Sequence, residues 1–185
     1  MAAADDEILD VVDANDDVVG EASRADVHAN GLRHRSVHVL VVNTSGKVLT
    51  QRRGLHKDCD PGLWDTSAAG HVGRGERYET AASRELYEEL GLAGLRLHGL
   101  CQLPADPRTG FEFVHAYLCV TDLAPVPAAE EIEDIAWHTS EDLRDRMSRD
   151  PSHYTDSIKL IFSVYLNSLR TNREPLWHGD TSSGG

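Results

Sequence analysis

The stretch GHVGRGERYETAASRELYEELGL, residues 70–92, combines a glycine-rich loop with an amphipathic helical pattern. Gly70, Gly73 and Gly75 supply a loop whose backbone can approach a ligand closely. Apolar residues then recur at helical spacing, and Gly91 is placed to close the helix in a left-handed cap. The apolar positions are Ala81, Ala82, Leu86 and Leu90. The stretch therefore predicts a loop followed by a helix.

The same helix carries a crowded acidic face. Glu85, Glu88 and Glu89 stand at i, i+3 and i+4, so a helix stacks all three carboxylates on one side. A solvated outer face is the simpler interpretation. However, like charges at these spacings repel by a few tenths of a kcal/mol per pair, and no lysine follows Glu85 or Glu88 at i+4 to offset this. A bound hard cation, which shares its remaining positions with phosphate and water, accounts better for the pattern.

Composition is typical of one globular domain. The chain has 185 residues, of which 40% are hydrophobic and 26% charged. No apolar run approaches the ~18 residues of a membrane span, and the start MAAADDEILD lacks the features of a signal peptide, so we expect a cytoplasmic protein without a membrane partner. The net charge of −13 argues against a nucleic-acid partner, because phosphate-backbone binding depends on clustered Lys and Arg.

The hydrophobic pattern predicts a mixed α/β domain over residues 7–170, with a disordered N-terminus at 1–6 and a C-terminal tail at 171–185. Strands are predicted at 8–13, 18–23, 36–43, 47–53, 63–70, 95–103, 111–120 and 132–138. Helices are predicted at 140–147, capped by Ser140, and at 157–170. The second has an apolar stripe interpreted as a core-facing surface, formed by Ile158, Ile161, Phe162, Tyr165 and Leu169.

Residues 70–92 resemble the Nudix box, G-x5-E-x7-R-E-U-x-E-E-x-G-U with U aliphatic. Every specified position is filled, by Gly70, Glu76, Arg84, Glu85, Leu86, Glu88, Glu89, Gly91 and Leu92. The resemblance implies an α/β/α sandwich with a mixed β-sheet and a loop–helix–loop catalytic motif. It also implies hydrolysis of a diphosphate bond, with nucleoside diphosphate-type compounds as the expected small-molecule substrates.

The Nudix resemblance assigns roles to individual residues. It implies a Mg²⁺ site, with Mn²⁺ as the alternative ion, formed by Gly70, Glu85, Glu88 and Glu89. Glu76 and Arg84 would form a structural pair that braces the loop, and the catalytic residues would be Glu85, Glu89 and Arg84. The base that deprotonates the attacking water stays open between Glu85, Glu89 and an acid of a neighbouring loop, for which Glu130, Glu131 and Glu133 are candidates beside their interpretation as a solvated turn.

A second resemblance extends over residues 7–170 and is to isopentenyl diphosphate isomerases, which share the Nudix fold. It is carried by the histidines His28, His34 and His71 and by NTSGKVLTQRR, HKDCDPGLW and SAAGH. In those isomerases, histidines near these places bind a metal, while a Cys and a Glu shuttle the proton. Here Ala69 stands at the Cys position. The Glu-x-Glu strand of the isomerases aligns best with Phe113–His115, which leaves Glu112 facing the other side of its strand.

These differences favour a hydrolase on an isomerase-like frame, with an isomerase-like protein that acts on or binds a prenyl diphosphate as the alternative. The frame implies substrate phosphate near Arg52, Arg53 and Lys57, although each could equally be a solvated surface residue. His71 is the best candidate for a substrate contact. The three histidines are either a second metal site or hydrogen-bonding neighbours. Cys59 is interpreted as incidental. We expect a monomer or a homodimer.

Overall fold

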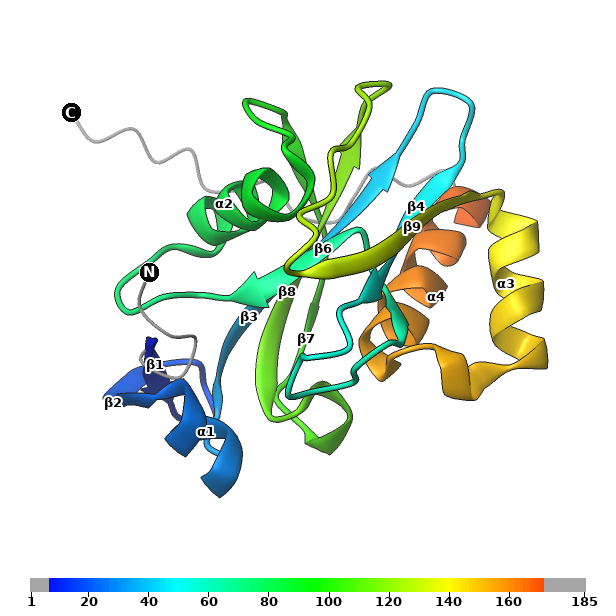
Figure 1. The fold of residues 1–185 in the computed structure, drawn as a ribbon. Helices are drawn as coiled ribbons and strands as arrows, with labels where there is room; N and C mark the ends of the chain where they lie inside the picture. Colours follow the sequence, from blue (N-terminus) through cyan, green and yellow to red (C-terminus); the bar gives the residue numbers. More distant parts are fainter. Residues whose placement is uncertain (1–6, 172–185) are drawn as a thin grey trace.

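The structure is a computed structural model that describes residues 7–171, and it folds them into a mixed β-sheet between helices (Figure 1). The sheet comprises β3 (His34–Val42), β4 (Val48–Arg53), β5 (Trp64–Asp65), β6 (Ala68–His71), β7 (Leu97–Leu103), β8 (Glu112–Val120) and β9 (Ile132–His138). The longer helices are α2 (Tyr78–Leu90), α3 (Ser140–Arg149) and α4 (Asp156–Thr171). Short 3₁₀ turns are η2 (Pro107–Thr109) and η3 (Pro151–His153).

Strand β3 organises the sheet. It pairs in parallel with β8, from His34 opposite Glu112 to Val42 opposite Val120, whereas its other neighbours, β4 and β6, run antiparallel to it. The main path is β5-β4-β3-β8-β7, with β9 paired to β4. This confirms the predicted mixed sheet, and the parallel register brings the starts of β3 and β8 side by side.

Alternation along β3 produces two cores, one on each face of the sheet. Val37, Val39 and Val41 pack with the apolar face of α2. Leu40 and Val42 pack on the opposite face with residues of α3 and α4 (Figure 1). This arrangement is the predicted α/β/α sandwich. At the start of β3 the second face becomes polar, because the alternating positions are His34, Ser36 and His38.

The predicted N-terminal hairpin lies beside this polar end, together with a helix that the sequence analysis missed. Strands β1 (Ile8–Val12) and β2 (Val18–Ser23) form a separate antiparallel pair that leads directly into α1 (Arg24–Asn30). Ser23 caps α1, since its side chain accepts a hydrogen bond from the Asp26 backbone N–H at 3.1 Å. The motif Ser23-x-x-Asp26 was the available signal for this helix.

Other expectations are corrected in detail. The predicted extended segment 63–70 consists of two strands, because β5 pairs with β4 and β6 pairs with β3. Helix α3 is capped by Thr139, whose side chain accepts from the Asp142 N–H, and not by Ser140. Four residues of the predicted stripe on α4 are buried, but Leu169 is 55% exposed. Gly91 closes α2 with φ 66° as predicted.

The structure describes only part of the two terminal segments. The predicted disordered segment 1–6 and residues 172–185 of the predicted tail lie outside the described residues, whereas Thr171 is the last residue of α4. Within 7–171, no helix combines the length and the apolar character that a bilayer span requires.

Candidate functional site

The loop before α2 is held by one arginine. Arg84 Nε and Nη2 donate to the two carboxylate oxygens of Glu76 at 3.0 and 2.9 Å, and Nη2 also donates to the His71 carbonyl at 3.0 Å. Glu76 in turn accepts from the Gly73 backbone N–H at 2.9 Å. This bidentate geometry fixes where the loop enters the helix. The structure thus places Glu76 and Arg84 together, as the spacing predicts.

The acids on the acidic face of α2 differ in how deeply they are buried. Glu88 is exposed, whereas Glu89 is 4% exposed and accepts from Gln51 Nε2 at 2.8 Å and from the Ala69 backbone N–H at 3.0 Å. Burial, and then the neighbouring charge of Glu85, raise the pKa of Glu89 to about 8. Burial also raises the pKa of Glu85. A buried and a half-buried carboxyl with raised pKa values next to each other are the arrangement that a cation would stabilise.

Arg84 also offsets the repulsion that the sequence left unexplained. Its Nη1 donates to Glu85 at 2.6 Å and to Glu88 at 3.0 Å. Arg84, four residues before Glu88, therefore supplies part of the positive charge that offsets this repulsion. The sequence analysis did not consider this position. Glu89 receives no such pairing among the described residues, because its partners are the amide of Gln51 and a backbone N–H.

Gly70 lies against the acidic face. A Cβ atom at this position would stand 2.1 Å from the Glu85 carboxyl carbon, so no side chain fits there while Glu85 keeps its place. The glycine thus lets the backbone of β6 approach the carboxylates, and its carbonyl belongs to the same wall as Glu85, Glu88 and Glu89. An all-oxygen donor set of this kind suits Mg²⁺ or Mn²⁺.

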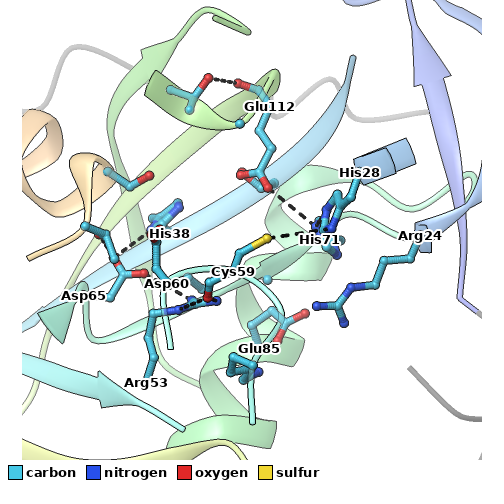
Figure 2. Close-up of a pocket in the computed structure, with 18 of the residues that line it drawn as sticks. Arg24, His28, His38, Arg53, Cys59, Asp60, Asp65, His71, Glu85 and Glu112 are labelled. Carbon is cyan, nitrogen blue, oxygen red and sulfur yellow. Dashed lines mark hydrogen bonds and ion pairs between the residues drawn. The ribbon is translucent and has the colours of Figure 1, made fainter. Parts of the chain in front are cut away.

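These residues form one wall of a cavity of about 500 Å³ (Figure 2). Two of the four predicted substrate residues are cations that line it. Arg53 donates to the Cys59 carbonyl at 2.9 and 3.1 Å and to Asp65 at 3.3 Å, and Lys57 pairs with Glu131. Each of these basic groups is therefore already engaged with one or more acceptors.

Arg52 is placed elsewhere, which corrects the prediction. It pairs with Glu133 at 3.5 Å and does not line the cavity. Arg52 and Arg53 lie at a register shift between β4 and β9, and of the two only Arg53 lines the cavity. Glu131, by contrast, lines the cavity, whereas Glu130 and Glu133 do not.

Arg24 is a cavity residue that the sequence analysis missed together with α1. Its side chain is 16% exposed and points into the cavity (Figure 2). The only ion pair described for it is with Asp58 at 3.5 Å, and Nε has no hydrogen-bond partner within residues 7–171. Arg24 therefore retains unused donors that face the cavity.

The three histidines and Glu112 form a cluster at the start of β3 and β8. One ligand atom from each of His28, His34, His71 and Glu112 lies within 4.8 Å of all the others. The Nε2 atoms of His28 and His71 are 3.2 Å apart, and Glu112 Oε1 lies 3.4 Å from His34 Nε2 and 3.5 Å from His71 Nε2. Nitrogen and oxygen ligands that converge in this way match the donor set of a transition metal.

The other nitrogen of each histidine in the cluster faces an acceptor. Nδ1 lies 2.9 Å from the Leu32 carbonyl in His34, 3.5 Å from Glu7 in His71, and 3.9 Å from the Cys59 sulfur in His28. Partners of this kind orient metal-binding imidazoles with Nε2 toward the metal. Cys59 is thus not incidental, since its thiol contacts His28.

The charges of the histidine cluster compensate one another. Burial opposes the charged form of His71, but hydrogen bonds to Glu112 and Glu7 outweigh it and raise the pKa of His71 to about 9. Burial and the neighbouring charges of His71 and His34 lower the pKa of His28 to about 4. A proton on His71 therefore compensates the carboxylates, and His71 is enclosed by the cluster as well as lining the cavity.

The position of Glu112 corrects the expected alignment. Glu112 pairs with His34 in the parallel register, so the two side chains share one face of the sheet. The expectation that Glu112 faces the other side of its strand, away from the histidines, is therefore wrong. With Glu112 as the first acid of the Glu-x-Glu pair, the second position is Val114, which is buried and apolar.

Comparisons with known proteins are consistent with this geometry. The NUDIX domain family model matches residues 32–158. An uncharacterised Nudix hydrolase of Streptomyces coelicolor is 41% identical over 139 residues, 75% of this chain and 76% of that protein. An isopentenyl-diphosphate Delta-isomerase of Serratia proteamaculans is 32% identical over 176 residues, 93% of this chain and 96% of that protein. A crystal structure from Deinococcus radiodurans has a TM-score of 0.76 and 30% identity, and covers 86% of this chain and 99% of its own.

Proposed function

The chain belongs to the Nudix family and is a hydrolase of diphosphate bonds, and we propose that it is a Mg²⁺-dependent pyrophosphohydrolase acting on a nucleoside diphosphate-type substrate. The observation that carries this proposal is the carboxylate pair of half-buried Glu85 and buried Glu89 beside Gly70, in a cavity that also contains cationic side chains. Carboxylates would hold the metal and cations would hold the phosphates. The same cavity therefore contains both kinds of group that a metal-assisted phosphoryl transfer requires.

The metal would be held by Gly70, Glu85, Glu88 and Glu89. The donor chemistry fits, because Glu85 and Glu89 both have raised pKa values that a divalent cation would reverse. Bound Mg²⁺, or Mn²⁺ in its place, would neutralise charge on the diphosphate and lower the pKa of a coordinated water. Arg84 keeps Glu85 and Glu88 oriented toward this position through its hydrogen bonds at 2.6 and 3.0 Å.

The base that takes the proton of the attacking water is proposed among three acids. Glu85 and Glu89 are held by the helix; the pKa of Glu89, about 8, suits proton transfer near neutral pH, and burial also raises the pKa of Glu85. Of the three acids considered in the neighbouring loop, only Glu131 lines the cavity, where it pairs with Lys57. Glu131 is therefore the loop candidate, in preference to Glu130 and Glu133.

Substrate phosphate is proposed to bind Arg24, Arg53 and Lys57. Replacing Arg24 with alanine is expected to lower kcat/KM by about 10–100-fold, because a charge-assisted hydrogen bond to phosphate contributes about 1.5–3 kcal/mol. Arg52→Ala is the matched control on the surface, and we expect less than about a threefold change for an exposed charge. Steady-state kinetics of both variants check this assignment, and equal losses would contradict it.

The histidine cluster is proposed as a second metal site. We expect purified protein to bind one equivalent of Zn²⁺ or Co²⁺ there, and His34→Ala to weaken this binding by more than about 100-fold. His153→Ala, which removes an exposed histidine outside the cavity, is the control and should leave the affinity unchanged. Titration with Co²⁺ followed by absorption measures both, and tight binding by His34→Ala would rule the site out.

The same cluster favours the second candidate function, isomerisation or binding of a prenyl diphosphate. Two positions argue against isomerisation. Ala69 cannot carry a proton, and Val114 occupies the place of the second acid once Glu112 is taken as the first. Without both proton carriers the chain lacks the groups that would move a hydrogen across a double bond.

The experiment that tests the proposed function is a product analysis. The purified chain is incubated with Mg²⁺ and nucleoside diphosphates, nucleoside triphosphates, nucleotide sugars or isopentenyl diphosphate, and products are identified by phosphorus NMR and mass spectrometry. Release of phosphate or pyrophosphate that stops with chelator supports hydrolysis. Isomerised prenyl diphosphate without hydrolysis would instead establish the second candidate.

Several expectations stay predictions. They are the domain limits 7–170, the monomeric or homodimeric state, the cytoplasmic location, and the absence of nucleic-acid and membrane partners. The negative net charge of −13 supports the exclusion of nucleic acid.

A further inference from the structure

A histidine outside both metal-binding groups lies on the floor of the cavity. His38 follows His34 and Ser36 on the same face of β3, and its side chain is directed toward the cavity (Figure 2). It is 5% exposed. The roles assigned above to the acids of α2 and to the histidine cluster make no use of it. The presence of a buried imidazole in this cavity is therefore not explained by the roles assigned so far.

Its hydrogen bonds define the tautomer. Thr66 Oγ1 donates to the Ala68 carbonyl at 3.3 Å, so its single proton is used there. With its proton directed there, the same oxygen, 2.8 Å from His38 Nδ1, is placed to accept a hydrogen bond from the Nδ1–H tautomer. Burial lowers the pKa of His38, which favours the neutral ring. Nε2 therefore carries a lone pair.

That lone pair has no protein partner. No hydrogen bond to His38 Nε2 is present within residues 7–171, and Asp65, the nearest acid, lies on the Nδ1 side at 3.8 Å. Asp65 is itself occupied by the Thr66 N–H, by Thr155 and by Arg53. Nε2 is therefore an available acceptor on a residue that lines the cavity.

A second unsatisfied polar group lies beside it. Ser36 Oγ is buried and has no hydrogen-bond partner in the part of the chain that the structure describes. Ser36 and His38 share one face of β3, so both belong to the same polar floor. Buried groups without partners are costly unless a ligand or water satisfies them.

The side chains that line the rest of the cavity favour a polar group as its occupant. Among the described residues that line the cavity, only Ala69 and Phe111 have hydrocarbon side chains, and most of the others are charged or polar. A prenyl chain on this floor would leave Ser36 and His38 unsatisfied. A group with O–H or N–H donors would satisfy them.

We propose that His38 is a specificity-determining residue whose Nε2 accepts a hydrogen bond from an O–H or N–H donor on the group attached to the diphosphate, with Ser36 as a second contact. The donor chemistry is that of a hydroxylated sugar or an amino-substituted base. This inference rests on the proposed function, since it assigns the cavity floor to the substrate of the same site.

Two substitutions distinguish the proposed contact of His38 Nε2 with the substrate from the hydrogen bond between His38 Nδ1 and Thr66. His38→Asn keeps a side-chain amide that can donate to Thr66 in place of Nδ1 but has no atom at the position of Nε2. His38→Gln restores a polar atom near Nε2. Because the Thr66 hydrogen bond is retained, we expect His38→Asn to unfold within a few degrees of the wild type. Ser36→Ala provides a third variant that is independent of the imidazole.

Binding of a nucleoside diphosphate, UDP, and of isopentenyl diphosphate is measured by calorimetry in Ca²⁺, so the comparison does not depend on turnover. We expect His38→Asn to weaken UDP binding by about tenfold, His38→Gln and Ser36→Ala to weaken it less, and isopentenyl diphosphate binding to change by less than about threefold. Equal UDP affinity of His38→Asn and wild type, equal losses for both ligands, or no UDP binding by the wild type would overturn the inference. Failure of the proposed function appears separately, as UDP binding without hydrolysis of any diphosphate in Mg²⁺.

Discussion

Replacing Glu89 with glutamine is expected to lower kcat by about 10²–10⁴-fold while the protein stays folded, because the substitution removes a metal ligand and candidate base but keeps the shape of the side chain. Glu89 is 4% exposed and held by Gln51 and the Ala69 N–H. The amide oxygen of glutamine can accept both of these hydrogen bonds. Steady-state kinetics with saturating Mg²⁺ measure the loss.

Thermal unfolding distinguishes this loss from misfolding. Burial raises the pKa of Glu89 to about 8, which means that ionising it in the folded protein is unfavourable. A neutral glutamine is therefore expected to leave the melting temperature unchanged or to increase it. Activity close to that of the wild type would contradict the role of Glu89.

The pH dependence of metal binding gives a second readout for Glu89. A proton and Mg²⁺ compete for this carboxylate, so the Mg²⁺ affinity of the wild type should rise with pH until the pKa of about 8 is passed. Glutamine does not titrate, so this part of the pH dependence should disappear in the variant. Calorimetric titrations across that range in both proteins measure the difference.

Replacing Gly70 with alanine is expected to cause a comparably large loss, through geometry. The new Cβ would stand 2.1 Å from the Glu85 carboxyl carbon, so the carboxylate or the strand must move. Displacing a catalytic group by about 1 Å costs on the order of 100-fold in rate. Overpacking of this kind also destabilises by about 1–3 kcal/mol. Kinetics and thermal unfolding measure both effects.

Gly73→Ala is the matched control in the same loop. A Cβ at Gly73 would lie 3.4 Å from a Glu76 carboxylate oxygen, which is ordinary contact distance, and its backbone is not in the left-handed region. We expect activity within about threefold of the wild type and less than about 1 kcal/mol of destabilisation. Equal behaviour of the two variants would show that close packing of Gly70 on Glu85 is not required.

Local patterns in the sequence were sufficient for the catalytic helix. The periodic Ala81, Ala82, Leu86 and Leu90 predict α2, and the acids at i, i+3 and i+4 share a face wherever that helix forms. Alternation along residues 36–43 likewise predicts the central strand. These features depend on the helix and strand periods, which neighbouring residues set by themselves.

Short-range signals were present but missed for α1. Ser23-x-x-Asp26 is a helix start, and recognising it would have predicted a helix that carries Arg24 and His28 at i and i+4, on one face. Their approach to the cavity could not have been deduced from this alone. It depends on how the hairpin of β1 and β2 packs beside β3, which contacts distant in the chain decide.

What the sequence by itself determined is the chemistry available: an acidic loop–helix motif, three histidines and a set of arginines in a Nudix-type mixed sheet. Which of these groups meet was decided by the tertiary structure. The parallel register of β3 and β8 placed Glu112 beside His34, and the register shift at the end of β4 accompanies the placement of Arg53 at the cavity and of Arg52 beside Glu133. The physical reason is that side chains alternate every residue along a strand, so a shift of one residue moves a side chain to the opposite face, and only the packing of the whole sheet sets that register.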